Sequence, residues 1–115
     1  MSDRPVLAHL SLTHEAQQYE PEENKAGRRA EILVKEDDLR VTLITMRVGI
    51  ELDEHSVAGT ATIQVLEGRF EINYPDGSET IGPGELIALR RDVKHSVKAL
   101  KSGAFLLTLG WSASS

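Results

Sequence analysis

Beyond residue 30 the chain is divided into short runs of strand-forming residues, separated by residues that form turns. The runs are rich in Val, Ile, Thr and Leu, and most of them alternate apolar and polar positions. Turn signals stand between them, including Pro75-Asp76-Gly77 and Gly82-Pro83-Gly84. No segment in this region keeps a helical period. Many short strands with such punctuation predict an all-β sandwich or barrel.

The runs expected as strands share high β-propensity and flanking turn residues. They are Ile32–Val34, Leu39–Val48, Thr60–Leu66, Arg69–Tyr74, Ser78–Ile81, Glu85–Leu89, His95–Leu100 and Ala104–Leu109. In the second run the alternation slips by one position between Leu43 and Ile44. This slip predicts either a β-bulge or burial of both faces of the strand.

The first part of the chain is less regular. Residues 1–29 are expected to form an N-terminal arm, residues 30–111 the barrel domain, and residues 112–115 a tail. Within the arm, His9–Thr13 alternates and predicts a short strand at a sheet edge. Polar residues follow it, with one helical turn expected at Glu15–Tyr19.

Composition narrows the class of protein. A chain of 115 residues fits one domain. Its formal net charge of −5, without a basic stripe, argues against a nucleic-acid partner. The chain has no cysteine, which excludes disulfides and thiolate metal sites and suits a cytoplasmic protein. Met1–Leu12 lacks the apolar run of a signal peptide, and no stretch is long enough to span a membrane, so no membrane association is expected.

Two histidines follow glycines at similar spacing. Gly49 is followed by five residues and then His55, and the glycine of a closing turn comes at Gly68. Further along, Gly84 precedes His95, and fifteen residues separate Gly68 from Gly84. Gly68 and Gly84 suit tight turns with positive φ, because glycine has no Cβ to clash there.

This spacing resembles the two motifs of the cupin family, G-x5-H-x-H-x3,4-E-x6-G and G-x5-P-x-G-x2-H-x3-N. In the first motif, Gly49, His55 and Gly68 agree with the family, whereas Val57 replaces the second histidine and Ala61 replaces the glutamate.

In the second motif, His95 falls on the family's histidine. Arg90 stands in place of the proline, Asp92 in place of the glycine and Ala99 in place of the asparagine. The resemblance implies a double-stranded β-helix, or jelly-roll, barrel over most of residues 30–109.

In the family, three histidines and a glutamate hold one divalent metal. Of these four positions, His55 and His95 are the candidate metal ligands, because Val57 and Ala61 cannot coordinate a metal. The resemblance leaves metal binding possible without implying it. Asp53 lies two residues before His55, on the same face of an extended strand, and is a third candidate ligand. A site of two histidines and one carboxylate would suit iron, and manganese, nickel, zinc or no metal at all stay open.

Three hypotheses follow for the cavity around His55 and His95. In the first, the cavity holds a divalent metal. In the second, no metal is bound and the histidines act as acid and base in an isomerase- or epimerase-type enzyme. In the third, the barrel is a non-catalytic module that binds or senses a small molecule. Enzymatic activity is left open. Arg40 or Arg47 could bind a carboxylate or phosphate if either faced the cavity, although solvated charges on a strand face are the commoner case. Trp111 could cover a barrel end, an interface or a ligand.

The expected partner, besides a small-molecule ligand, is a second copy of the chain. Small single-domain cupins are commonly homodimers, and two-fold symmetry is the commonest arrangement of oligomers. Strand edges of a half-open barrel also need to be covered, and His9–Thr13 could pair with an edge of the same chain or of a neighbour.

Overall fold

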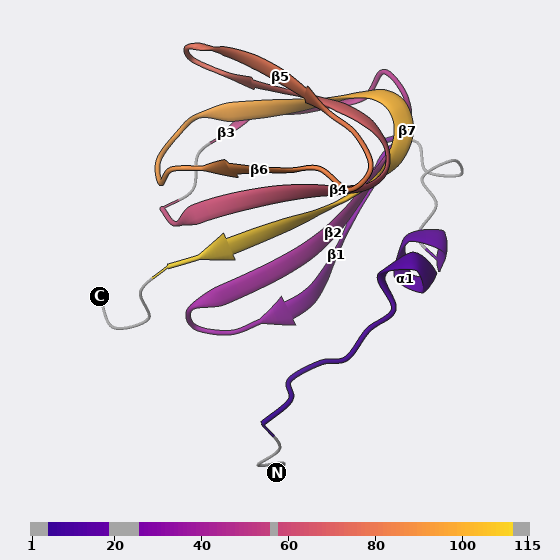
Figure 1. Ribbon diagram of the computed structural model, residues 1–115, viewed down its shortest axis with the longest axis vertical. Coiled ribbons are helices and arrows are strands. Elements are labelled where there is room, and N and C mark those ends of the chain that lie inside the picture. Colours follow the sequence, from indigo (N-terminus) through magenta and orange to yellow (C-terminus); the bar gives the residue numbers. More distant parts are fainter. Residues whose placement is uncertain (1–4, 19–25, 56–57, 112–115) are drawn as a thin grey trace.

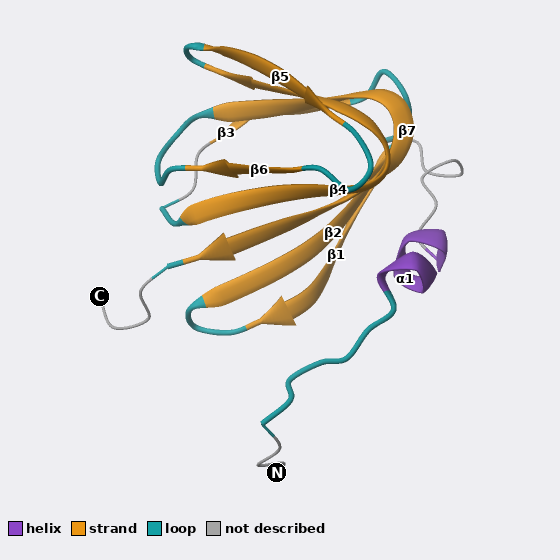
Figure 2. Ribbon diagram, viewed as in Figure 1, coloured by secondary structure: helices purple, strands orange, loops and turns teal. Residues whose placement is uncertain are grey.

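The computed structural model describes residues 5–18, 26–55 and 58–111, and for residues 54 and 55 it describes the backbone alone. In chain order the elements are α1 (Leu12–Gln18), β1 (Arg28–Lys35), β2 (Leu39–Met46), β3 (Glu51–His55), β4 (Thr60–Tyr74), β5 (Gly77–Ile81), β6 (Leu86–Leu89) and β7 (His95–Gly110). All strand pairs are antiparallel, and Figure 2 shows strands in nearly the whole body of the molecule. The prediction of an all-β jelly-roll barrel is confirmed.

Two long strands organise the barrel. In the larger layer, the second half of β7 pairs with the first half of β4. On the outer sides of this pair, β2 pairs with β7 and β6 pairs with β4, and β1 extends the layer beyond β2. Their other halves pair again, now flanked by β3 and β5. Figure 1 shows β4 and β7 bending together at one side, so both ends of each strand lie at the opposite side. We call that opposite side the barrel mouth.

The bend depends on two glycines that face each other. Gly68 of β4 has a φ of 86°, and the pairing of β4 with β7 shifts register on both sides of it. A Cβ built on Gly103 would lie 2.6 Å from the Cα of Gly68 and would also collide with the carbonyl oxygen of Glu67. The two backbones therefore meet where no side chain fits, which lets both strands bend at one point.

The main core lies between the layers. Two residues beyond each bend glycine, Phe70 and Phe105 point inward, and their rings pack edge to face with centroids 5.0 Å apart. The buried residues around them share the inner face of the strands and are Ile44, Met46, Ile63, Val65, Ile72, Ile81, Leu89, Val97 and Ala99.

A second apolar cluster lies on the outer face of the larger layer. Leu43, Ala104 and Leu106 are buried there beneath Ala16 of helix α1, and Leu12 packs against the same cluster. Leu12 and Ala16 are four residues apart and so share one face of the helix. The helix thus covers sheet residues that would otherwise be exposed to water.

Helix α1 corrects the prediction for the arm, because a strand over His9–Thr13 is wrong. Ser11 precedes the helix as its N-cap, and its hydroxyl accepts a hydrogen bond of 3.3 Å from the backbone N–H of His14. Burial of Leu12 and Ala16 then favours the helix over an extended strand. The expected turn at Glu15–Tyr19 overlaps the helix, although Tyr19 lies outside the described residues. This helix is too short and too polar to cross a membrane, and the described part of the chain holds no other helix that could.

In two places, a pair of runs predicted as separate strands forms one continuous strand. Thr60–Leu66 and Arg69–Tyr74 join in β4, and His95–Leu100 and Ala104–Leu109 join in β7. The alternation breaks at the bend, so each strand was predicted in two parts.

The slip in the alternation of β2 reflects burial on both faces. The pairing of β2 with β7 continues without interruption, while Leu43 belongs to the outer cluster and Ile44 to the inner core. A bulge at this position, the other explanation, is therefore wrong.

We expect Gly103→Ala to destabilise the protein by about 3 kcal/mol or to prevent folding, because the new methyl group would force the two backbones apart. Gly110→Ala is the matched control on the same strand, since its nearest neighbour would be the carbonyl oxygen of Asp38 at 4.0 Å. Chemical denaturation of both variants measures the difference. Equal stabilities would show that close contact at the bend does not limit the fold.

Candidate functional site

The barrel mouth gathers the ends of the long strands and the loops that join them. Tyr74 ends β4, and His95 begins β7. The turn between β4 and β5 and the loop between β6 and β7 also lie on this side (Figure 1).

His95 is a buried residue, with 2% of its surface exposed. Its ring Nδ1 lies 3.1 Å from the backbone carbonyl oxygen of Val93. The tautomer that carries its proton on Nδ1 donates to that carbonyl and has its lone pair on Nε2. The carbonyl thus orients the ring as it orients many metal-binding histidines, although a structural histidine can be held in the same way.

The backbone brings the two motif histidines together. β3 ends at His55, and His55 pairs with His95 in the ladder between β3 and β7. The side chain of His55 and the whole of Val57 lie outside the described residues.

The other positions of the metal motif are less favourable. The side chain of Asp53 is exposed, and the β3–β7 pairing shifts register between Leu52 and His55, which interrupts the alternation that linked Asp53 to His55. Ala61 is 1% exposed and pairs with Leu89 and Leu109 in an apolar part of the sheet. Among side chains that the structure describes, no three His, Cys, Asp or Glu residues come together as a metal site.

The second motif keeps its turn despite its substitutions. Asp92, which occupies the position of the family's glycine, has a φ of 64°. Aspartate is one of the few residues with a side chain that adopt this left-handed conformation readily. The loop therefore keeps the conformation for which the family uses glycine, and Val93 follows directly after it.

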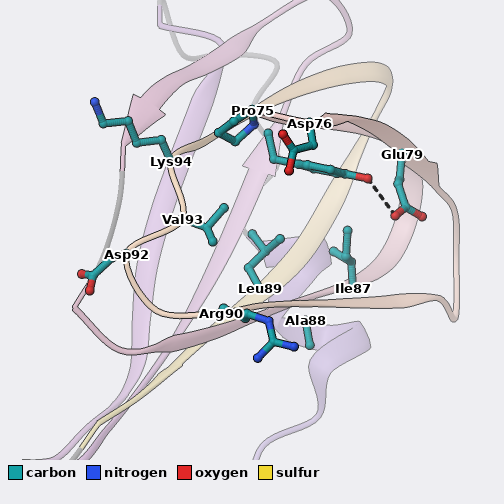
Figure 3. A pocket seen from close by; sticks show the side chains of 11 residues that line it. Pro75, Asp76, Glu79, Ile87, Ala88, Leu89, Arg90, Asp92, Val93 and Lys94 are labelled. Carbon is teal, nitrogen blue, oxygen red and sulfur yellow. Dashed lines mark hydrogen bonds between the residues drawn. The ribbon is translucent and has the colours of Figure 1, made fainter.

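A hollow of about 610 Å³ opens at the mouth between the β4–β5 hairpin and the loop after β6. Figure 3 shows the apolar side chains of Ile87, Leu89 and Val93 in this lining, to which Tyr74 also belongs. The remaining lining residues, mostly polar and at the rim, are Pro75, Asp76, Glu79, Ala88, Arg90, Asp92 and Lys94. The hollow is therefore apolar inside and polar around its opening.

One hydrogen-bonded pair lines this hollow. The hydroxyl of Tyr74 donates to Glu79 Oε2 at a distance of 3.1 Å (Figure 3). This hydrogen bond, desolvation and the nearby charges of Glu79 and Asp76 raise the pKa of Tyr74 above its ordinary value. The phenol is thus held protonated, as a hydrogen-bonding group at the edge of an apolar wall.

Most of these lining residues were not among the candidate site residues predicted from the sequence. A signal existed, because Phe70, Ile72 and Tyr74 alternate and the first two are core residues, which predicts Tyr74 on the inner face. The hairpin then placed Glu79 near Tyr74. Leu89 and Val93 reach the hollow only through the folding of β6 over β4, which no local pattern shows.

Comparison with solved structures agrees with this architecture. The chain is similar to a conserved protein of unknown function from Streptococcus pyogenes, with a TM-score of 0.78 and 22% identity over 96% of this chain and 93% of that one. A cupin superfamily protein from Desulfitobacterium hafniense gives a TM-score of 0.78 at 16% identity, covering 96% of this chain and 97% of the other. A cupin 2 conserved barrel domain protein from Leptotrichia buccalis gives 0.74 at 25% identity, covering 83% of this chain and 45% of that one.

No protein-family model matches the sequence, and no curated protein matches it. The chain nevertheless has the cupin fold, so the resemblance seen in the two motifs is confirmed at the level of the fold. It is a small protein built on a cupin barrel.

Proposed function

We propose that this cupin binds a small organic molecule in the hollow at the barrel mouth. The observation that carries the proposal is the hollow itself, whose volume of about 610 Å³ lies in the ordinary range for small-molecule sites. Ile87, Leu89 and Val93 supply an apolar wall, and Tyr74 lines the same hollow. A ligand with a flat or branched apolar body would fill this space and displace water from it.

The polar groups of the hollow suit orientation of a ligand. The Tyr74–Glu79 pair offers a hydroxyl and a carboxylate at one edge, so a single polar group on the ligand has a hydrogen-bonding partner. Few polar anchors and a large apolar wall are typical of binding sites that recognise shape.

Binding is favoured over the isomerase or epimerase alternative by the position of the candidate base. Val93 and Lys94 line the hollow, and His95 follows them directly, yet it is 2% exposed and its Nδ1 lies at the Val93 carbonyl. An acid–base enzyme needs its base within hydrogen-bonding distance of the substrate.

A divalent metal held by His55 and His95 is the second candidate. The pairing of their backbones in the β3–β7 ladder and the orientation of the His95 ring support it. Metal sites in proteins usually take three or four protein ligands, and the described side chains do not provide that set.

Filling the hollow tests the first proposal. We expect a neutral apolar dye, N-phenylnaphthylamine, to bind saturably with increased fluorescence. Val93→Trp should weaken its binding roughly tenfold or more, because the larger side chain would occupy the space. Leu86→Trp is the control, since Leu86 lies on β6, is 56% exposed and is not part of the lining. Binding that is unchanged in Val93→Trp would place the dye elsewhere and contradict the proposal.

Metal content separates the two candidates. In untagged protein, after exposure to iron, manganese, nickel and zinc, we expect elemental mass spectrometry to find much less than one metal per chain, because too few described ligands meet. The control is the double variant His55→Ala, His95→Ala. Near-stoichiometric metal in the native protein that is lost in the variant would instead establish the two-histidine site and favour an oxygenase or isomerase.

We also propose that the chain forms a homodimer. The arm carries exposed apolar residues, with Val6 49% and Leu7 65% exposed, and Ile32 on the edge strand β1 is 54% exposed. Such residues on an open edge favour association with a second copy. Light scattering should give twice the mass of the chain, and the mass of a single chain would contradict the dimer.

A further inference from the structure

A second feature of the mouth lies away from the hollow, at the start of β2. The pairing of β2 with β7 has no register shift, and Ile44 and Met46 are inner core residues. Because side chains alternate along a strand, Arg40 shares their inner face. Arg40 pairs with Leu109, next to the end of β7, so it lies at the mouth.

The guanidinium of Arg40 is incompletely satisfied. Its Nε is buried and has no hydrogen-bond partner. The group stands over the ring of Trp111, with Cζ 5.9 Å from the ring centroid. The backbone N–H of Trp111 donates a hydrogen bond to the backbone carbonyl of Asp38. Buried polar atoms in proteins are nearly always hydrogen-bonded, so an unpaired donor on a cation indicates a missing acceptor.

A second cation faces Arg40. Lys35 of β1 is its direct partner in the β1–β2 ladder, and like charges in that arrangement destabilise a sheet. Both residues line a hollow of about 420 Å³ together with Trp111, Glu36 and Asp37. Within the described part of the chain, neither acidic residue forms an ion pair with Lys35 or Arg40.

We propose that this second hollow binds the carboxylate or phosphate group of a small anionic ligand. Arginine presents its N–H groups as a planar fork that matches both kinds of oxyanion, and Nε belongs to that fork. Lys35 adds a second positive charge, and Trp111 supports the flat face of the guanidinium. The bound oxyanion would accept hydrogen bonds from the guanidinium, with the Arg40 side chain turning to bring its buried Nε toward the hollow, and it would reduce the repulsion across the ladder.

This site is separate from the hollow proposed for the organic ligand. That hollow is lined by the β4–β5 hairpin, β6 and the following loop, whereas this one is lined by the β1–β2 turn and the residue after β7. The two proposals therefore stand or fall independently.

Trp111 supplies the measurement, because it is the one tryptophan of the chain. The full-length protein is titrated with sodium phosphate at ionic strength held constant with sodium chloride, and tryptophan fluorescence is followed. We expect a saturable change. A parallel titration with acetate distinguishes a phosphate site from a general carboxylate site, and absence of saturation with both anions would overturn the proposal.

Variants locate the effect. Arg40→Gln should weaken anion binding roughly tenfold or more, and Lys35→Gln by a smaller factor. Arg91→Gln, which changes an exposed cation outside this lining, is the control and should bind as the native protein does. Arg40→Lys keeps the positive charge but removes the planar fork of N–H groups, so it should also weaken anion binding. This variant replaces Arg40→Gln in the experiment if Arg40→Gln does not fold. Saturable binding that survives in either folded Arg40 variant would overturn the proposal.

Discussion

The close approach of Gly68 and Gly103 is the contact on which the barrel depends. At this point β4 and β7 have no room for a side chain between them, and both bend together. Beyond the bend, each strand runs back toward the side of the barrel where it began, now as part of the second layer. It also sets Phe70 and Phe105 edge to face in the space it encloses. A single backbone contact thus fixes the direction of the long strands and the centre of the core.

The position of the candidate sites follows from that bend. Because β4 and β7 turn back at one side, their four ends meet at the other, with the connecting loops (Figure 1). Tyr74, His95 and the residues before Trp111 are strand ends, and the bulk of the core lies deeper, toward the bend. The core therefore holds the mouth in place, and Leu89 belongs both to the core and to the lining of the hollow. The exposed side chains at the rim of the mouth are left to vary in chemistry.

Much of the fold could be predicted from the sequence because strands and turns are local patterns. The hairpin at Pro75-Asp76-Gly77 and the positive φ of Gly68 and Gly84 are confirmed. The continuity of β4 and β7 could not be predicted, because bending disrupts the alternation that marks a strand. Helix α1 was predicted only as one turn at Glu15–Tyr19, because the sheet face that it covers belongs to distant strands. For the site, motif spacing singled out His95, which begins β7 at the mouth, whereas the contribution of Leu89, Val93 and Tyr74 to one hollow is tertiary and has no local signal.

The two apolar clusters have a consequence for how this protein can change. Leu43 and Ile44 are neighbours in sequence, yet one belongs to the outer cluster under α1 and the other to the core inside the barrel. Substitutions that reshape the interior act on one set of alternate positions, and those that alter the docking of the helix act on the other. The packing of the barrel interior and the attachment of the N-terminal helix can therefore diverge independently, although both depend on residues of the same strands.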